Sequence, residues 1–208
     1  MNLFNILRQH VAAQPEAIAS RSSRRIVTYR KFWSRIERAT ARLKDEWHVR
    51  PGDTVAYWGR GHQDALMLYI AVARCGAKLL PLEHASLHQD SSVILRNIPA
   101  VLLLHDDETI FDVPPAASVV ANLSSLIATR CHHTPLVTED VHQPSLLSLV
   151  IEKDHVLQAE EHSLHQLTSA ASADATCTFR IAEALFDADI FAPQVVPVLV
   201  AGGTILFR

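Results

Sequence analysis

Histidine is frequent in this chain, and several histidines are spaced as metal ligands could be. The 208 residues include twelve histidines, and the close pairs are His84 with His88, His132 with His133, and His162 with His165. Two histidines four residues apart on a helix can share one metal ion. No pair has a convincing third ligand beside it, and His84 and His88 lie in loop-like sequence after Pro81. We therefore predict no metal site.

A short polar turn between two apolar runs is the second place where chemistry could occur. Glu152, Lys153 and Asp154 follow the run that ends at Ile151 and precede the run that begins at Val156. A phosphate site needs backbone N–H groups that approach the anion closely, which glycine permits. This turn has no glycine, and its two carboxylates would repel a phosphate. It is typical of a plain β-hairpin, which we predict over residues 146–159.

Nothing else in the sequence predicts a catalytic group. Serines are abundant, but no nucleophile-elbow pattern is present. Cys75, Cys131 and Cys177 are far apart and odd in number, which argues against a disulfide framework. Gly52 and Gly76 follow a proline and a cysteine at element ends, and we interpret both as structural, because backbone conformation or close packing there excludes a side chain.

Composition and charge exclude several classes of protein. Apolar residues make up 49% of the chain and charged residues 20%, which is typical of a globular protein. A net charge of −3 gives no general attraction to nucleic acid or to an anionic membrane. We interpret a basic cluster as solvated surface; it comprises Arg21, Arg24, Arg25, Arg30 and Lys31. Without a signal peptide or a long apolar segment, we expect a cytoplasmic protein.

Strands that alternate with helices predict an α/β fold, a layered architecture with mainly parallel sheets flanked by helices. Periodicity predicts helices over residues 29–47, 64–75 and 160–173. Strands are predicted over residues 54–58, 78–82 and 100–105, the last a continuous apolar run of the kind buried in a parallel sheet. We expect one domain over residues 1–208, with possible sub-lobes 1–130 and 140–208.

Short motifs that occur in order along the chain resemble the adenylate-forming (AMP-binding) superfamily. They are residues 15–19 (PEAIA), 28–29 (TY), 51–56 (PGDTVA), 69–72 (YIAV), 75–77 (CGA), 80–82 (LPL), 185–189 (LFDAD) and 199–206 (LVAGGTIL). The sequences of these motifs are most similar to those of the adenylation domains of nonribosomal peptide synthetases, and acyl-CoA synthetases are also similar. The resemblance covers only the N-terminal part of that superfamily and implies its N-terminal subdomain fold.

The resemblance also implies what is absent. Members of this superfamily activate a carboxylate with ATP and pass the acyl group to a thiol, using a glycine-rich phosphate loop with a lysine. The turn Glu152–Asp154 stands where that loop is expected, so the loop is interpreted as deleted. The superfamily's adenine motif, ribose-binding aspartate and catalytic lysine come later than residue 208. Asp187 matches the position that anchors the substrate amino group in amino-acid-activating relatives, although Asp189 stands where a small hydroxyl residue is usual.

Three interpretations remain open at this point. The chain is a degenerate homologue that acts by binding a protein, such as a synthetase or carrier protein, or by self-association. Alternatively it is one half of a split acyl- or aminoacyl-adenylating ligase, completed by another chain, and only then are ATP and Mg²⁺ expected. The third is a remnant without activity. We lean toward a non-catalytic interaction or regulatory subunit, with no cofactor, nucleic acid or membrane partner.

Overall fold

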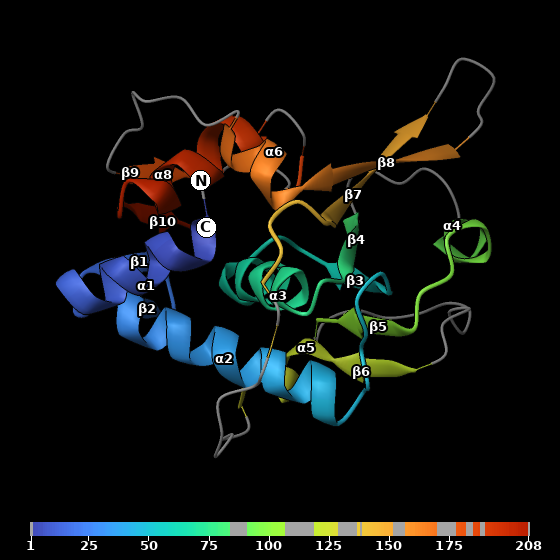
Figure 1. The fold of residues 1–208 in the computed structure, drawn as a ribbon, viewed down its shortest axis with the longest axis horizontal. Coiled ribbons are helices and arrows are strands. Elements are labelled where there is room, and N and C mark those ends of the chain that lie inside the picture. The colour runs from blue at the N-terminus through green and yellow to red at the C-terminus, as the bar shows by residue number, and fades with distance from the viewer. Residues whose placement is uncertain are drawn as a thin grey trace.

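The computed structural model describes residues 2–83, 91–106, 119–128, 137, 139–151, 157–169, 178–181, 185–187 and 190–207. Two sheets and the helices around them form the molecule (Figure 1). The first sheet has the strand order β2-β1-β10-β9, and the second has the order β6-β5-β3-β4-β7-β8. The predicted α/β class with mainly parallel sheets is confirmed.

The elements of the first sheet and its helices come from both ends of the chain. They are α1 (Leu3–Ala13), β1 (Ile18–Arg21), β2 (Ile26–Thr28), α2 (Tyr29–Asp45), β9 (Thr178–Arg180), η1 (Phe191–Val195), α8 (Val196–Val200) and β10 (Thr204–Leu206). Strand β10 lies parallel to β1, with Ser20 opposite Ile205. The Tyr29 hydroxyl donates a 2.8 Å hydrogen bond to the carbonyl of Gly203. The beginning and the end of the chain are therefore joined in one sheet. The proposed division into sub-lobes stays a prediction.

The second sheet and its helices occupy the middle of the chain. They are β3 (Thr54–Gly59), α3 (Gln63–Arg74), β4 (Lys78–Glu83), α4 (Ser91–Asn97), β5 (Leu102–His105), β6 (Val120–Asn122), α5 (Leu123–Ala128), β7 (Pro144–Ile151), β8 (Leu157–Ser163) and α6 (Leu164–Ser169). Strand β3 is central and runs parallel to both β4 and β5. Its residues are almost all buried, as continuous apolar strands of parallel sheets are. Among the described strands of this sheet only β7 and β8 pair antiparallel, as β1 and β2 do in the first sheet.

Local sequence explains where the principal helices begin and end. The Thr28 hydroxyl accepts from the backbone N–H of Lys31 and caps α2. Helix α3 is buried on all sides, because it lies between α2 and the second sheet (Figure 1). It ends at Arg74 and is followed by Cys75 and by Gly76, whose φ of +70° is the left-handed conformation that glycine favours. Gly52, with a φ of +87°, has the same conformation, which agrees with the structural role predicted for both glycines.

One predicted element is wrong in its first residues. The sequence predicted a helix over 160–173, but β8 continues to Ser163 and the helix α6 begins at Leu164. Strand pairing overrides helix propensity here, because β7 extends the register as far as Pro144 opposite Ser163. The helix start carries its own signal, since the Ser163 hydroxyl accepts from the N–H of Gln166 and the Gln166 side chain accepts from the N–H of Ser163.

Candidate functional site

The β7–β8 hairpin predicted from the polar turn is confirmed. The paired residues run without a break from Leu146 opposite His162 to Ile151 opposite Leu157. Only residues 152–156 connect the two strands, so the connection cannot contain a long loop. Glu152, Lys153 and Asp154 themselves lie outside the described residues. Their sequence, EKDHV over 152–156, contains neither a glycine nor a hydroxyl side chain.

The carboxyl ends of β3 and β5 are the place where an open α/β sheet usually binds a ligand. From β3 the chain goes first to β4 on one side and later to β5 on the other, so the strand order reverses between β3 and β5. Ligands of such sheets bind in the crevice outside the carboxyl ends of the strands at this reversal. Here β3 ends at Gly59 and is followed by Arg60, and β5 ends at His105 and is followed by Asp106.

The Asp106 carboxylate fills this position and is held by groups of the chain itself. Its Oδ1 accepts from the Tyr57 hydroxyl at 2.8 Å and from Nε2 of His62 at 2.8 Å, and its Oδ2 accepts from the backbone N–H of Arg60 at 2.8 Å. The His62 Nδ1 accepts from the N–H of Asp64 as the cap of α3, so the proton of a neutral ring lies on Nε2. Each of the three donors thus lies within hydrogen-bond distance of one half-buried carboxylate, and the Tyr57 hydroxyl also lies 2.7 Å from the carbonyl of Arg60, a second acceptor for its proton.

Electrostatics at Asp106 favours the ionised acid. Burial alone would raise the pKa of the Asp106 carboxyl, but the hydrogen bonds from His62, Arg60 and Tyr57 hold that pKa below its usual value. A Cβ on Gly59 would overlap both the Asp106 carboxylate and the Tyr57 hydroxyl, so glycine is needed for this close approach. The position therefore carries a negative charge that groups of the chain itself hold in place.

Asp187 lies near the same end of the sheet and is exposed to solvent. Its backbone carbonyl accepts from the N–H groups of Ile190 and Phe191 and starts the helical segment η1. The preceding Phe186 is buried and packs edge-on against Tyr57 and close to Tyr69, with ring centroids 6.5 and 6.2 Å apart. The structure therefore brings Asp187 to the neighbourhood of the Tyr57–Asp106 group. Asp189 lies outside the described residues.

The histidines pair differently from the sequence pattern. His165 stacks on His142, with ring centroids 4.5 Å apart and a tilt of 31°, and no ring contact joins His165 to His162 in the described ranges. Among the residues that the structure places, no three histidine, cysteine, aspartate or glutamate side chains are grouped as metal ligands. His84, His88, His132 and His133 lie outside the described residues.

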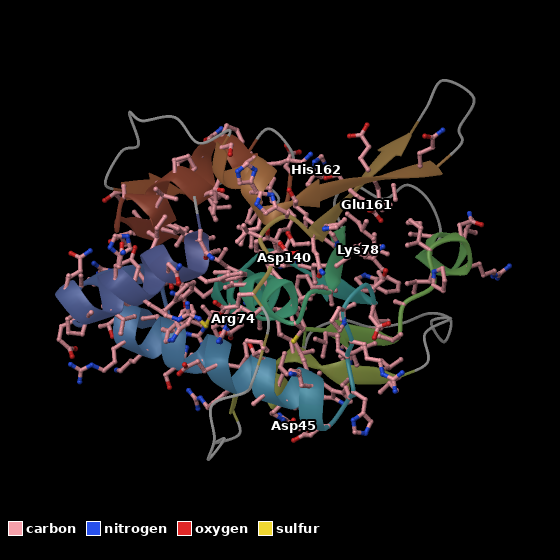
Figure 2. All side chains as sticks on the ribbon, in the orientation of Figure 1. Asp45, Arg74, Lys78, Asp140, Glu161 and His162 are labelled. Atoms are coloured by element: carbon pink, nitrogen blue, oxygen red, sulfur yellow. The ribbon has the colours of Figure 1, made fainter. Side chains whose placement is uncertain are left out.

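An open pocket of about 300 Å³ lies at the opposite, amino end of the second sheet. It is lined by Pro51, Gly52, Gly76, Lys78, Gln143 and Pro144. Lys78 on β4 and Glu161 on β8 point toward one another beside it and form an ion pair of 2.8 Å (Figure 2). The ammonium that could bind an anion is therefore already paired, and the pocket lies away from the strand ends where such sheets bind ligands.

Sequence reasoning missed the group formed by Tyr57, His62 and Asp106. A signal was available, because His105 and Asp106 directly follow an apolar parallel strand and Gly59 ends another. Polar residues at the carboxyl ends of adjacent parallel strands meet at one edge of a sheet. Which strands are adjacent depends on the topology, and the order β5-β3-β4 is not readable from local patterns.

Comparison with known proteins identifies the family. A sequence model of the AMP-binding enzyme family matches residues 7–178. The chain belongs to this family. Over 123 residues it is 25% identical to a 3-oxocholest-4-en-26-oate–CoA ligase of Rhodococcus rhodochrous, a match that covers 58% of this chain and 22% of the ligase.

Solved structures of adenylate-forming enzymes share the fold. The N-terminal domain of FACL13 from Mycobacterium tuberculosis superimposes with a TM-score of 0.85 at 15% identity, over 100% of this chain and 57% of that one. The nonribosomal peptide synthetase FmoA3 gives a TM-score of 0.82 at 17% identity, over 100% of this chain and 23% of the synthetase. O-succinylbenzoate coenzyme A synthetase of Bacillus subtilis gives 0.80 at 16% identity, over 98% and 55%.

These matches define which part of an AMP-binding enzyme the chain represents. The chain spans about a fifth of the Rhodococcus ligase and a little over half of the FACL13 domain. It corresponds to the N-terminal part of an adenylate-forming enzyme, as its motifs predicted. At these identities the structural likeness shows the fold and does not transfer a substrate. None of the helices in the described ranges is both long and apolar enough to cross a membrane.

Proposed function

We propose that this AMP-binding-family chain is non-catalytic by itself and acts as an interaction or regulatory subunit in the cytoplasm. The observation that supports it most is the short connection between β7 and β8. Pairing continues to Ile151 opposite Leu157, which leaves residues 152–156 to connect the strands. A phosphate cradle requires several backbone N–H groups that converge on one anion, and a five-residue connection without glycine is poorly suited to supply them.

The residues at the strand ends are also a poor fit for ATP. Transfer from a nucleotide needs cationic or metal charge against the phosphates. The described group at the β3–β5 reversal instead presents the Asp106 carboxylate, whose low pKa keeps it ionised at neutral pH. Lys153 is the one cation in the 152–156 connection, and it stands between Glu152 and Asp154. We therefore expect no ATP or Mg²⁺ on this chain.

The partner of such a subunit is another protein, for which a synthetase or a carrier protein is the simplest candidate, or a second copy of the chain. One continuous core joins α1, α3 and the β10 region. A surface on a stable α/β body suits a binding role.

The alternative is half of a split acyl- or aminoacyl-adenylating ligase. It rests on the membership of this chain in a family of AMP-binding enzymes. In that case a second polypeptide would have to supply the phosphate loop as well as the later motifs, and Asp187 would be available to a substrate amino group.

Pyrophosphate release distinguishes the two proposals. The purified chain is incubated with ATP, Mg²⁺ and a panel of fatty, aryl and amino acids, and pyrophosphate is measured enzymatically. No release above the acid-free blank is expected for the chain alone. Release that requires both an acid and this chain would contradict a non-catalytic subunit. Release that appears only after a second polypeptide is added, and falls with Asp187→Ala, would establish the split ligase instead.

A further inference from the structure

Positive charge is concentrated in one segment of this otherwise acidic chain. Residues 18–45, from β1 through α2, contain nine lysines and arginines and two acidic residues, a net charge of +7. The whole chain carries −3, so the remaining residues carry −10. Strand β2 and the first turns of α2 lie together at one end of the molecule, drawn in blue at the left of Figure 1. This asymmetry produces a local positive field on a protein with no overall attraction to anions.

At the centre of this segment, two arginines share one carboxylate. Asp64 pairs with Arg25 at 2.6 Å and with Arg35 at 4.0 Å. Burial lowers the pKa of the Arg35 guanidinium, and the charges of Arg25 and Arg38 lower it further, while Asp64 opposes them. A buried guanidinium nitrogen of Arg35 has no hydrogen-bond partner among the residues the structure places. Arg25 and Arg35 together carry more positive charge than the single Asp64 carboxylate neutralises.

The cations around this centre are open to solvent. Arg21, Arg24 and Lys31 are exposed, and no ion pair joins any of them to another residue of the described ranges. Opposite Arg21 in the β1–β2 pairing lies Ile26 of β2, with 49% of its surface exposed. Strand β2 is the edge of the first sheet, and within the described chain it pairs only with β1. An exposed apolar side chain on an open strand edge, flanked by unpaired cations, is the composition of an interaction surface rather than of a plain solvated face.

We infer that the β2 edge and the first half of α2 form a docking surface for an extended acidic protein segment. The open edge can pair with the backbone of an added strand, Ile26 can contact one apolar side chain, and the arginines can bind carboxylates. Protein is favoured over nucleic acid because the aromatic residues of this segment, Tyr29, Phe32 and Trp33, are buried and cannot stack with bases. The inference rests on the proposed binding role, for which it names the surface and the chemistry of the partner.

Fluorescence anisotropy with a labelled peptide of alternating glutamate and valine tests this surface. We expect saturable binding that weakens as salt increases, and no binding of the matching lysine–valine peptide. Arg24→Gln and Arg35→Gln should each weaken binding, and together by roughly tenfold or more, since a charge-assisted hydrogen bond contributes about that much. The matched control is Arg180→Gln on β9, which removes one exposed cation from the opposite edge of the same sheet and should leave binding unchanged.

The outcomes separate this inference from its alternatives. Arg24 is exposed, so Arg24→Gln should not unfold the protein, and thermal melts check the fold of each variant. No binding, or equal loss in Arg180→Gln, would overturn the inference and leave a charged edge that only prevents aggregation. Tighter binding of a thymidine oligonucleotide or of phosphatidylserine vesicles than of the peptide would also overturn it. ATP binding by the same protein would contradict the proposed function without changing the peptide result.

Discussion

The Asp106 carboxylate after β5 accepts a 2.8 Å hydrogen bond from the hydroxyl of Tyr57 on β3. The bond joins two parallel strands at the strand-order reversal, where related folds leave room for a ligand. The same carboxylate also accepts from His62 and from the N–H of Arg60, so its hydrogen-bonding capacity is satisfied by groups of the chain itself. In the described part of that edge, these hydrogen bonds therefore stabilise the fold.

Replacing either member of this pair should destabilise the fold. Tyr57→Phe should lower the free energy of unfolding by about 1 kcal/mol and Asp106→Asn by about 2 kcal/mol, because hydrogen bonds to a charged acceptor are the stronger ones. Urea unfolding at pH 7 measures both. The two effects should not fully add, since Tyr57→Phe removes the donor of this bond and Asp106→Asn weakens its acceptor by removing the charge. Full additivity in the double variant would show that the bond is not formed.

The same carboxylate should make the fold sensitive to acid. The pKa of Asp106 is lowered from 3.8 in the folded protein, so its stabilisation is present above pH 3.8 and is lost as the pH falls through the lower folded value. Asp106→Asn cannot lose this contribution. The difference in unfolding free energy between the two proteins should therefore be constant from pH 7 to about pH 5 and shrink below pH 4. A constant difference down to pH 2 would contradict the lowered pKa.

Gly59 should tolerate a methyl group only when Asp106 is shortened. A Cβ at Gly59 overlaps the Asp106 carboxylate and the Tyr57 hydroxyl, so Gly59→Ala should cost about 2 kcal/mol, as overpacking does. Asp106→Ala removes the main obstacle, and the double variant should be more stable than the sum of the two single effects predicts. Thermal unfolding of the four proteins measures this coupling. If the effect of the double variant equalled the sum of the two single effects, Gly59 and Asp106 would not be in close contact.

Replacing Glu139 should lower the free energy of unfolding more than replacing an exposed acidic residue. It pairs with Arg74 at 2.7 Å and also with Arg8, and both guanidiniums lie over the ring of Trp33. The Arg74 side chain is 3% exposed, so Glu139→Gln leaves a buried charge without its carboxylate and should cost about 3 kcal/mol. The control is Glu16→Gln, whose ion pair with Arg30 is exposed and should contribute less than about 1 kcal/mol. Similar costs for both variants would contradict this account.

Cys75 should be unreactive in the folded protein. Burial raises the pKa of its thiol to about 12, and the side chain is enclosed between α2 and α3. In a Cys131→Ser/Cys177→Ser background, the disulfide reagent DTNB at pH 8 should modify Cys75 only as fast as the protein unfolds. The raised pKa also implies that this residue's contribution to stability is present below about pH 9 and declines as the pH rises toward 12. Rapid modification in native buffer would show that the thiol is accessible.

The sequence predicted the α/β class well because the signal was local. Apolar runs such as the one that forms β5, and turn residues such as Gly52 and Gly76, specify strands and their ends without reference to the rest of the chain. The β8–α6 boundary was missed because pairing with β7 decides it. The Tyr57–Asp106 pair was missed for the same reason, since it depends on which strands are neighbours. His165 likewise stacks on His142, which is distant in sequence, and not on His162.

Isothermal titration calorimetry with ATP and Mg²⁺ measures directly whether this chain binds the nucleotide. The protein is used at a concentration that detects millimolar affinity, and Lys153→Ala is titrated in parallel. We expect no saturable heat and no thermal stabilisation for either protein, because residues 152–156 offer no phosphate cradle. Saturable binding by the unaltered chain, lost or weakened in Lys153→Ala, would contradict the account and show that the short connection between β7 and β8 holds a phosphate.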